Sequence, residues 1–296
     1  QGARVGKGKA IVNILPIPIG TSIAAIMPVD APEEDWANLQ IIFATSGGDV
    51  RRNVLADFTN VRSNGKIAMD LPDGVKLVNV WVATKNDDVM LVTNSGRAIR
   101  FASNDIRVFK GRKSTGVRGI KLLCDDHVVS MSVIRHFFAS PDERSAYLKM
   151  RRAVAGMIDD DHTNDEEEIN PNATISPERY AEMSAAENLI LTISAGGSGK
   201  LSSSHDYPIR GRGGMGVAAM DKNMRGGHLV ASFPVEIDDQ VMLATSKGQS
   251  IRVPVDGIPF RSRSAGGVRV FDTGEEEEVV SVARIADQAD EDGPEK

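Results

Sequence analysis

Short apolar runs alternate with glycine-containing turns along the chain, and residues 87–134 show this pattern most clearly. Residues 89–92 form an apolar run of the kind that is typical of a buried strand. Asn94-Ser95-Gly96 follows as a hairpin turn, because glycine accepts the positive φ that tight turns require. A returning strand, a basic loop and two further apolar segments come next, at residues 98–101, 110–116, 117–122 and 128–134. The pattern therefore predicts a module of four strands.

The same pattern recurs in three other stretches, residues 39–84, 187–235 and 239–285. The spacing between the hairpin glycine and the glycine of the basic loop is nearly constant. It is 17, 20, 19 and 19 residues for the pairs Gly48 and Gly65, Gly96 and Gly116, Gly197 and Gly216, and Gly248 and Gly267. A period near 50 residues with four strands per copy is typical of propeller-like blades. We expect an all-β array with one short α-helical insertion.

The repeats divide the chain into segments. Residues 1–29 match the second half of a repeat, with strands expected at residues 11–14 and 23–29, so we expect the chain to begin within a blade. Complete blades are predicted at residues 30–84, 85–134, 187–235 and 236–285. Residues 135–186 interrupt the array as an acidic insertion. Residues 286–296 form an acidic tail that we expect to be disordered.

The insertion carries two helix-start signals. Ser140-Pro141-Asp142-Glu143 is a capping box with proline at the first helical position, and it predicts a helix through about residue 157. Ser176-Pro177-Glu178 predicts a second, shorter helix toward residue 186. The acidic run at residues 159–168 between them is expected to be a flexible loop.

Composition narrows the class of protein. Hydrophobic residues make up 41% of the chain, which is enough to form a core, but no apolar run is long enough to span a bilayer. The sequence has no signal-peptide segment at its start. The single cysteine, Cys124, can form no internal disulfide, which fits a reducing cytoplasm. We therefore expect a cytoplasmic protein.

The net charge of −6 is unevenly distributed. Residues 1–134 carry 17 basic and 13 acidic side chains, and residues 187–271 carry 10 and 7, so the predicted blades are mildly basic. The insertion, residues 135–186, has 6 basic and 11 acidic side chains, and residues 272–296 have 2 and 10. The acidic overall charge therefore hides a basic array.

Lysine and arginine recur at similar places in the repeats, around the loop glycine and after the hairpin turn. Because equivalent positions lie at equivalent places on each blade, these side chains are expected to form one stripe suited to a phosphate backbone. The alternative is that they only keep the turns soluble, but acidic residues are scarce in the same loops. The candidate DNA-binding residues are Arg51, Arg52, Arg62, Lys66, Arg97, Arg100, Lys110, Arg112, Lys113, Arg118, Lys121, Lys200, Arg210, Arg212, Arg252, Arg261, Arg263 and Arg269.

Other motifs carry less weight. Gly211, Gly213 and Gly216 match a dinucleotide-binding fingerprint, but no helix of adequate length follows them. Residues 196–200 resemble a phosphate-binding loop but lack its first glycine and its final serine or threonine. The five histidines show no metal-ligand spacing, and Ser204-His205-Asp206 are too close in sequence for a catalytic triad. We predict no catalytic centre and no metal site.

Several segments carry a resemblance to a known family. They are IVNILPIPIGTSIAAIMPV (11–29), GKIAMDLPDG (65–74), DDVMLVTNSGRAIRF (87–101), TGVRGIKL (115–122) and DQVMLATSKGQSIRV (239–253). These segments occur in the same order in the C-terminal domains of DNA gyrase A subunits, the β-pinwheels, which the chain resembles. The resemblance implies blades arranged as in a propeller, with strands exchanged between neighbouring blades. The family usually has six blades and a glycine-rich box in the first, whereas this chain shows four and a half blades and lacks the box.

The resemblance also implies a function. The outer rim of such a domain wraps duplex DNA, so that gyrase, an assembly of two A and two B subunits, introduces negative supercoils at the bacterial nucleoid. ATP, Mg²⁺ and the DNA-cleaving tyrosine act elsewhere in that ATP-hydrolysing type II topoisomerase. Tyr147, Tyr180 and Tyr207 are therefore not catalytic, and this chain is not an enzyme and needs no cofactor. The alternatives are a propeller that binds proteins and the C-terminal domain of a topoisomerase IV A subunit.

The expected mechanism is electrostatic. Lysine and arginine on the rim contact phosphates along the inner side of a bent duplex, and bending costs about 1–6 kcal/mol over 20–30 base pairs. Sequence readout should be weak because phosphate contacts position the duplex without specifying its sequence. The acidic tail is expected to compete with DNA for the rim.

Overall fold

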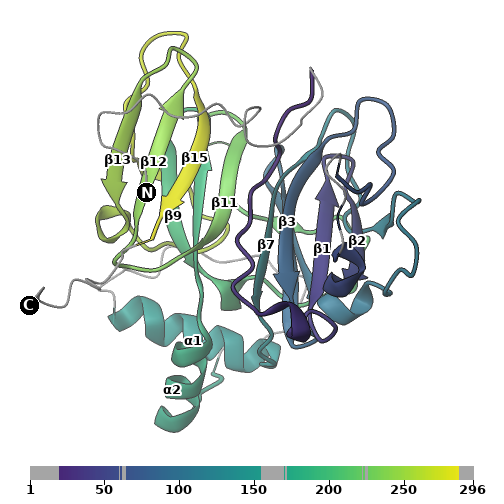
Figure 1. Ribbon diagram of the computed structural model, residues 1–296. Helices are drawn as coiled ribbons and strands as arrows, with labels where there is room; N and C mark the ends of the chain where they lie inside the picture. The colour runs from purple at the N-terminus through teal and green to yellow at the C-terminus, as the bar shows by residue number, and fades with distance from the viewer. Residues whose placement is uncertain are drawn as a thin grey trace, which may run out of the picture.

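The computed structural model describes residues 20–59, 61, 65–154, 170, 172–221, 223 and 226–286. These residues form four antiparallel sheets and two helices (Figure 1). The first three sheets have four strands each, and the fourth has three among the described residues. The prediction of an all-β array of blades with a helical insertion is confirmed.

Each repeat contributes one hairpin and one further long strand. The long strands are β1 (Gln40–Thr45), β2 (Asp49–Val54), β3 (Leu77–Ala83), β4 (Asp87–Thr93), β5 (Arg97–Ala102), β7 (Val128–Arg135), β8 (Leu189–Ser194), β9 (Ser198–Ser203), β11 (Leu229–Val235), β12 (Gln240–Thr245), β13 (Ser250–Pro254) and β15 (Val279–Ile285). Three strands of two residues are β6 (Val117–Arg118), β10 (Val217–Ala218) and β14 (Val268–Arg269). Short 3₁₀ turns are η2 (Glu33–Asp35), η3 (Leu55–Phe58), η4 (Ser103–Asp105), η5 (Ser204–Asp206) and η6 (Val255–Gly257).

The short strands do not join the sheet of their own repeat. The strand orders are β3-β1-β2-β6, β10-β5-β4-β7 and β11-β8-β9-β14, so each short strand pairs with the hairpin of the preceding repeat. β6, for example, places Val117 opposite Val50 and Arg118 opposite Asp49. The strand exchange implied by the resemblance is thus confirmed. The prediction that the four strands of one repeat form one module is wrong, because every four-stranded sheet takes strands from two repeats.

The loop glycines permit this exchange. Gly116 has φ +105°, and a Cβ at this position would lie 2.3 Å from the carbonyl oxygen of Val50. Gly216 has φ +71°, and its Cβ would lie 2.3 Å from the carbonyl oxygen of Ala98. An L side chain would meet both a backbone clash and a left-handed conformation at these two positions. Glycine is therefore required where the exchanged strand meets the preceding hairpin.

Neighbouring sheets pack face to face. One core cluster joins Ile42 of β1 to Leu91 of β4 and Met131 of β7, and another joins Leu191 of β8 to Leu243 of β12. Each sheet contacts the next through its last long strand: β3 contacts β7, β7 contacts β11, and β11 contacts β15 (Figure 1). Because the inner sheets are covered on both faces, nearly every residue of β4 and β8 is buried. A polar strand residue there must find its partners inside the protein.

The insertion forms α1 (Pro141–Val154) and α2 (Pro177–Ala186). The predicted capping box is present: the Glu143 N–H donates to Ser140 Oγ (3.2 Å), and the Ser140 N–H donates to Glu143 Oε2 (2.8 Å). α1 packs on η5 beyond the ends of the strands (Figure 1). The Tyr147 ring lies edge-on to His205, and the His205 ring bonds through Nε2 to the carbonyl of Met183 in α2 (2.8 Å).

One strand prediction is wrong, and some other predictions lie outside the described residues. The strand expected at residues 23–29 is wrong, since these residues have no regular secondary structure. They pack instead against the first sheet, where Met27 and Val29 lie beside Ile41 and Phe43. The earlier half of the partial blade, the acidic loop at 159–168 and the tail from residue 287 lie outside the described residues.

Candidate nucleic-acid interface

The candidate cations occupy a few equivalent positions in the repeats, and burial separates them into two groups. Four candidates in β2, β5 and β9 are buried: Arg51, Arg52, Arg100 and Lys200 have exposed fractions of 0%, 6%, 3% and 0%. The structure thus differs from the expectation of a surface position for these four residues. Neighbouring sheets cover both faces of these strands, so their charges are held by protein groups instead of solvent.

Arg51 illustrates the buried group. Its Nη1 donates to the carbonyl oxygen of Ser114 (2.7 Å) and to Ser114 Oγ (2.6 Å), and its Nε donates to Asn53 Oδ1 (2.8 Å). The guanidinium also lies over the Phe109 ring, 4.7 Å from its centre. Desolvation lowers the pKa of Arg51, and Asp70 opposes that shift. Arg51 therefore joins the first repeat to the basic loop of the second.

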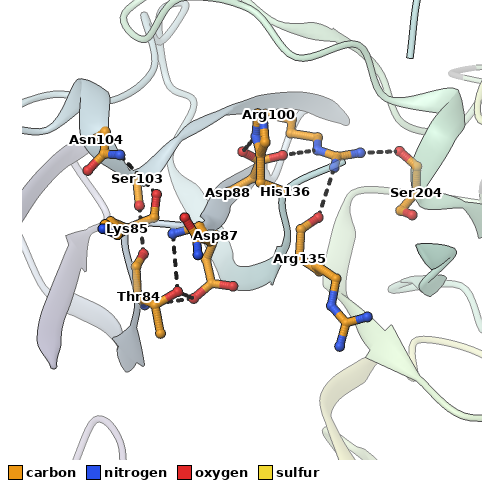
Figure 2. A network of polar contacts seen from close by, with 11 residues as sticks. Thr84, Lys85, Asp87, Asp88, Arg100, Ser103, Asn104, Arg135, His136 and Ser204 are labelled. Atoms are coloured by element: carbon orange, nitrogen blue, oxygen red, sulfur yellow. Dashed lines mark hydrogen bonds and ion pairs between the residues drawn. The ribbon is translucent and has the colours of Figure 1, made fainter. Parts of the chain in front are cut away.

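Arg52 and Arg100 both stand four residues after a hairpin glycine and bond to the 3₁₀ turn of the next repeat. Arg52 Nη1 donates to Asn104 Oδ1 of η4 (2.9 Å), and Arg100 Nη1 donates to the Ser204 carbonyl of η5 (2.7 Å). Arg100 Nε also pairs with the buried Asp88 (2.8 Å), whose other oxygen meets His136 Nδ1 (2.7 Å), as Figure 2 shows. These arginines hold successive repeats together.

A second recurring position lies four residues before the loop glycine and is occupied by Arg112, Arg212 and Arg263. Each donates to the backbone carbonyl of an aspartate in the 3₁₀ turn of the preceding repeat: to Asp57 of η3 from Arg112 (Nη1, 3.4 Å), to Asp105 of η4 from Arg212 (Nε, 2.9 Å) and to Asp206 of η5 from Arg263 (Nε, 2.9 Å). Arg263 is only 3% exposed, whereas Arg212 is exposed and Arg112 half-buried. The position is structural in all three repeats, and in the first two it also faces solvent.

The remaining candidates lie at or near the surface. Lys110, Lys113, Arg118, Lys121, Arg252 and Arg269 are exposed, and Lys66, Arg97, Arg210 and Arg261 are half-buried. Lys66 Nζ donates to the carbonyls of Asp57 (2.7 Å) and Thr59 (3.0 Å), and Arg97 Nη1 reaches the Gly216 carbonyl at 3.4 Å. Arg62 lies outside the described residues.

The exposed cations and some of the half-buried ones lie along the outer edges of the sheets. Lys110, Arg210 and Arg261 all stand six residues before a loop glycine. Arg118 and Arg269 lie on β6 and β14, each of which is the edge strand of its sheet. The backbone N–H groups of Arg210 and Arg261 donate to the carbonyls of Arg100 and Leu201, which both stand four residues after a hairpin glycine, so these two arginines occupy the same place. In the second repeat Phe109 occupies that place, directly before Lys110. We call this set of Lys110, Lys113, Arg118, Lys121, Arg210, Arg212, Arg261 and Arg269 the basic rim.

One exposed cation on this edge was missed from the sequence. Arg107 lies over the ring of Phe109, 4.3 Å from its centre, on the approach to the basic loop. Its counterparts in the next two repeats are Pro208 and Pro259, since Val108, Ile209 and Phe260 make equivalent bridges to the preceding repeat. A search for recurring charges therefore passes over it, and only its place directly before the loop signals a role.

The residues of the rejected motifs have structural partners. Asp206 accepts a hydrogen bond from the Arg263 N–H (2.6 Å), and Nε2 of His205 bonds to the Met183 carbonyl of α2 (2.8 Å). Among the described residues, no cluster of three or more His, Cys, Asp or Glu side chains could hold a metal ion. In the same part of the chain, no helix is long and apolar enough to cross a membrane.

The structural comparisons match the fold. The chain resembles the solved C-terminal domain of DNA topoisomerase IV, with a TM-score of 0.69 and 20% identity over 94% of this chain and 71% of that one. A solved DNA gyrase A C-terminal domain gives a TM-score of 0.60 at 19% identity, over 84% of this chain and 66% of that one. At these identities the likeness establishes the fold.

The sequence comparisons identify the family. The DNA gyrase A subunit of Granulibacter bethesdensis is 43% identical over 95% of the chain, and that of Rickettsia bellii is 39% identical over 97%. The chain spans 31% of each of these relatives. The family model described as "DNA gyrase C-terminal domain, beta-propeller" matches residues 40–80, 87–135, 188–235 and 239–286, one segment for each repeat. The chain therefore belongs to the DNA gyrase C-terminal domain family.

Proposed function

We propose that this chain binds duplex DNA along the basic rim and bends it around the outer edges of the sheets. The observation that carries the proposal is that Lys and Arg with exposed or half-buried side chains recur beside β6, β10 and β14. A rigid array with one cation site per repeat offers phosphates a curved track. The contacts release counterions and offset a bending free energy of about 1–6 kcal/mol.

The relatives extend this role to the whole protein. The chain would act as part of a gyrase A protein that assembles with gyrase B in the bacterial cytoplasm and uses ATP and Mg²⁺ bound elsewhere. The bent duplex would be presented for strand passage, which introduces negative supercoils. Within that assembly the chain itself would contribute binding and curvature, with no cofactor and no catalytic residue of its own.

Salt titration of duplex binding tests the proposal. We expect the affinity to fall steeply with salt, and the triple variant Lys110→Glu, Lys113→Glu and Arg118→Glu to weaken binding. If each of these residues neutralises one phosphate, the slope of log K against log salt should decrease by about 3, since each contact contributes about 0.9. All three are exposed, so the change should leave the fold intact.

A matched control reverses three exposed lysines that are not part of the basic rim: Lys76 before β3, Lys85 between β3 and β4, and Lys149 on α1. This variant has the same net charge as the rim variant, so only position distinguishes them. Equal losses in both variants would mean that DNA responds to total charge and would overturn the rim. Binding that does not depend on salt would favour the protein-binding alternative.

A further inference from the structure

Two buried cations occupy the same place in alternate repeats. Arg51 and Lys200 both stand three residues after a hairpin glycine, Gly48 and Gly197. The other two repeats have isoleucine there, Ile99 and Ile251. Since Ile99 is itself buried in the core, the fold can fill this position with an apolar side chain. The cation must therefore do something beyond filling space.

Both cations hold backbone carbonyls of the basic loop in the following repeat. Lys200 Nζ donates to the carbonyls of Ser262 and Ala265, both at 2.7 Å, and to that of Arg263. Arg51 donates to the carbonyl of Ser114 (2.7 Å). Ser114 and Ala265 occupy the same loop position, two residues before Gly116 and Gly267. The same contact has thus been built twice, once with each type of cation.

The loops that are held in this way carry cations of the basic rim. The loop bound by Arg51 contains Lys110 and Lys113 and leads into Arg118 on β6. Two guanidinium groups, those of Arg51 and Arg107, lie over the ring of Phe109 directly before this loop, at 4.7 and 4.3 Å from the ring centre. The loop bound by Lys200 contains Arg261 and leads into Arg269 on β14.

The loop between them is held differently. It faces Ile99, whose Cδ1 lies 3.7 Å from the place of a Cβ on Gly214, and it is anchored by backbone bonds from Gly213 N to the Gly119 carbonyl (2.6 Å) and from Lys121 N to the Gly214 carbonyl (2.8 Å). Arg212 of this loop also donates to the carbonyls of Asp105 (2.9 Å) and Arg118 (3.0 Å). Lys200 differs because it reaches from β9 to three carbonyls of one loop at once and so fixes the shape of that loop.

We propose that Arg51 and Lys200 are positioning residues for DNA: by holding the carbonyls of the next basic loop, they set the direction in which its rim cations face the phosphates. This inference rests on the proposed function of the rim. Preorganised contacts favour a bent duplex because the loop loses no further conformational freedom on binding. A loop without its cation would still attract DNA but would not impose one curvature.

The test replaces each cation by the residue that other repeats use. In the 296-residue chain, Arg51→Ile and Lys200→Ile are compared with the charge-conserving Arg51→Lys and Lys200→Arg. The readouts are duplex affinity, its salt slope, and the end-to-end distance of a duplex labelled at both ends for energy transfer. We expect the isoleucine variants to bind unbent duplex within about threefold of wild type but to bend it less, and the charge-conserving variants to restore the bend.

Amide hydrogen exchange without DNA supplies a second readout. Protection should fall at residues 110–116 in Arg51→Ile and at residues 262–267 in Lys200→Ile, while the sheets keep theirs. Should an isoleucine variant fail to fold, Arg51→Gln and Lys200→Gln, which keep a donor without the charge, carry the same comparison.

The outcomes separate the two proposals. A wild-type chain that binds DNA without salt dependence overturns the proposed function. A wild-type chain that bends DNA, together with isoleucine variants that bend it equally and keep their loop protection, overturns the positioning role alone.

Discussion

Gly116 and Val50 make the contact that locks one repeat into the next: a Cβ on Gly116 would stand 2.3 Å from the Val50 carbonyl oxygen. The two residues are 66 positions apart in sequence, yet Val50 pairs with Val117, the neighbour of Gly116. The exchange of strands therefore depends on a residue without a side chain at this point.

Replacing Gly116 by alanine should destabilise the chain. The added methyl group would clash with the Val50 backbone, and φ is +105°, a conformation that L side chains rarely adopt. We therefore expect a loss of about 2–4 kcal/mol in the free energy of unfolding, measured by denaturant titration. Gly111→Ala is the control, because no atom lies within 4 Å of the added Cβ and its φ is not positive. Equal stability of the two variants would show that the loop can move away from β2.

The Asp88–Arg100 pair should matter far more than a surface pair. Asp88→Asn leaves the Arg100 guanidinium buried without its counter-ion, and removing one partner of such a pair costs about 3–5 kcal/mol. Asp272→Asn breaks a pair of similar length, Arg269–Asp272 at 2.9 Å, whose side chains are 73% and 80% exposed. We expect less than about 1 kcal/mol there. Thermal or denaturant unfolding of both variants decides the comparison.

Lowering the pH should destabilise the folded chain through His205. Burial lowers the pKa of His205 below its ordinary value of 6.5; the Met183 hydrogen bond and Glu187 oppose that shift, and the charges of Arg100 and Arg144 add to it. The unfolded chain then binds more protons than the folded chain as the pH drops below 6.5. The free energy of unfolding therefore declines below this pH and stops declining once the folded pKa is passed.

Denaturant titrations between pH 8 and pH 5 measure this effect. The slope from one ionisable group is at most about 1.4 kcal/mol per pH unit. His205→Gln, whose side chain can still donate to Met183, should flatten the profile, whereas the exposed His127→Gln should not. A profile that keeps its slope in His205→Gln would assign the pH dependence to another group.

The acidic tail should weaken DNA binding at low salt. Residues 286–296 carry five acidic side chains and one basic one, so their deletion should tighten duplex binding severalfold at about 50 mM salt and have little effect at about 300 mM, where charges are screened. A tail of equal length with Asn and Gln in place of Asp and Glu should behave like the deletion. Affinity that is unchanged by both would remove the tail as a competitor.

Local patterns in the sequence predicted most of the elements, although not the irregular backbone at residues 23–29. Four hairpins, their turn glycines and the capping box at Ser140 and Glu143 were all placed correctly, since each depends on residues close together in the chain. The recurring charges were also found. Local patterns did not predict which repeat each short strand joins. A strand of two residues, such as Val117 and Arg118, is too short for its pattern to indicate a pairing partner 67 to 69 positions away.

Side chains at the same position in different repeats differ in how deeply they are buried. Arg52, Arg100 and Arg252 stand at the same distance from a hairpin glycine, yet the first two are buried and the third is exposed. The amino-acid pattern was enough to establish that the chain is a repeat array with cations at fixed points. Whether a given cation faces solvent or a carbonyl depends on the sheet packed beside it, since strand exchange covers β2 and β5 with the next repeat, whereas no described residue pairs with the outer edge of β13.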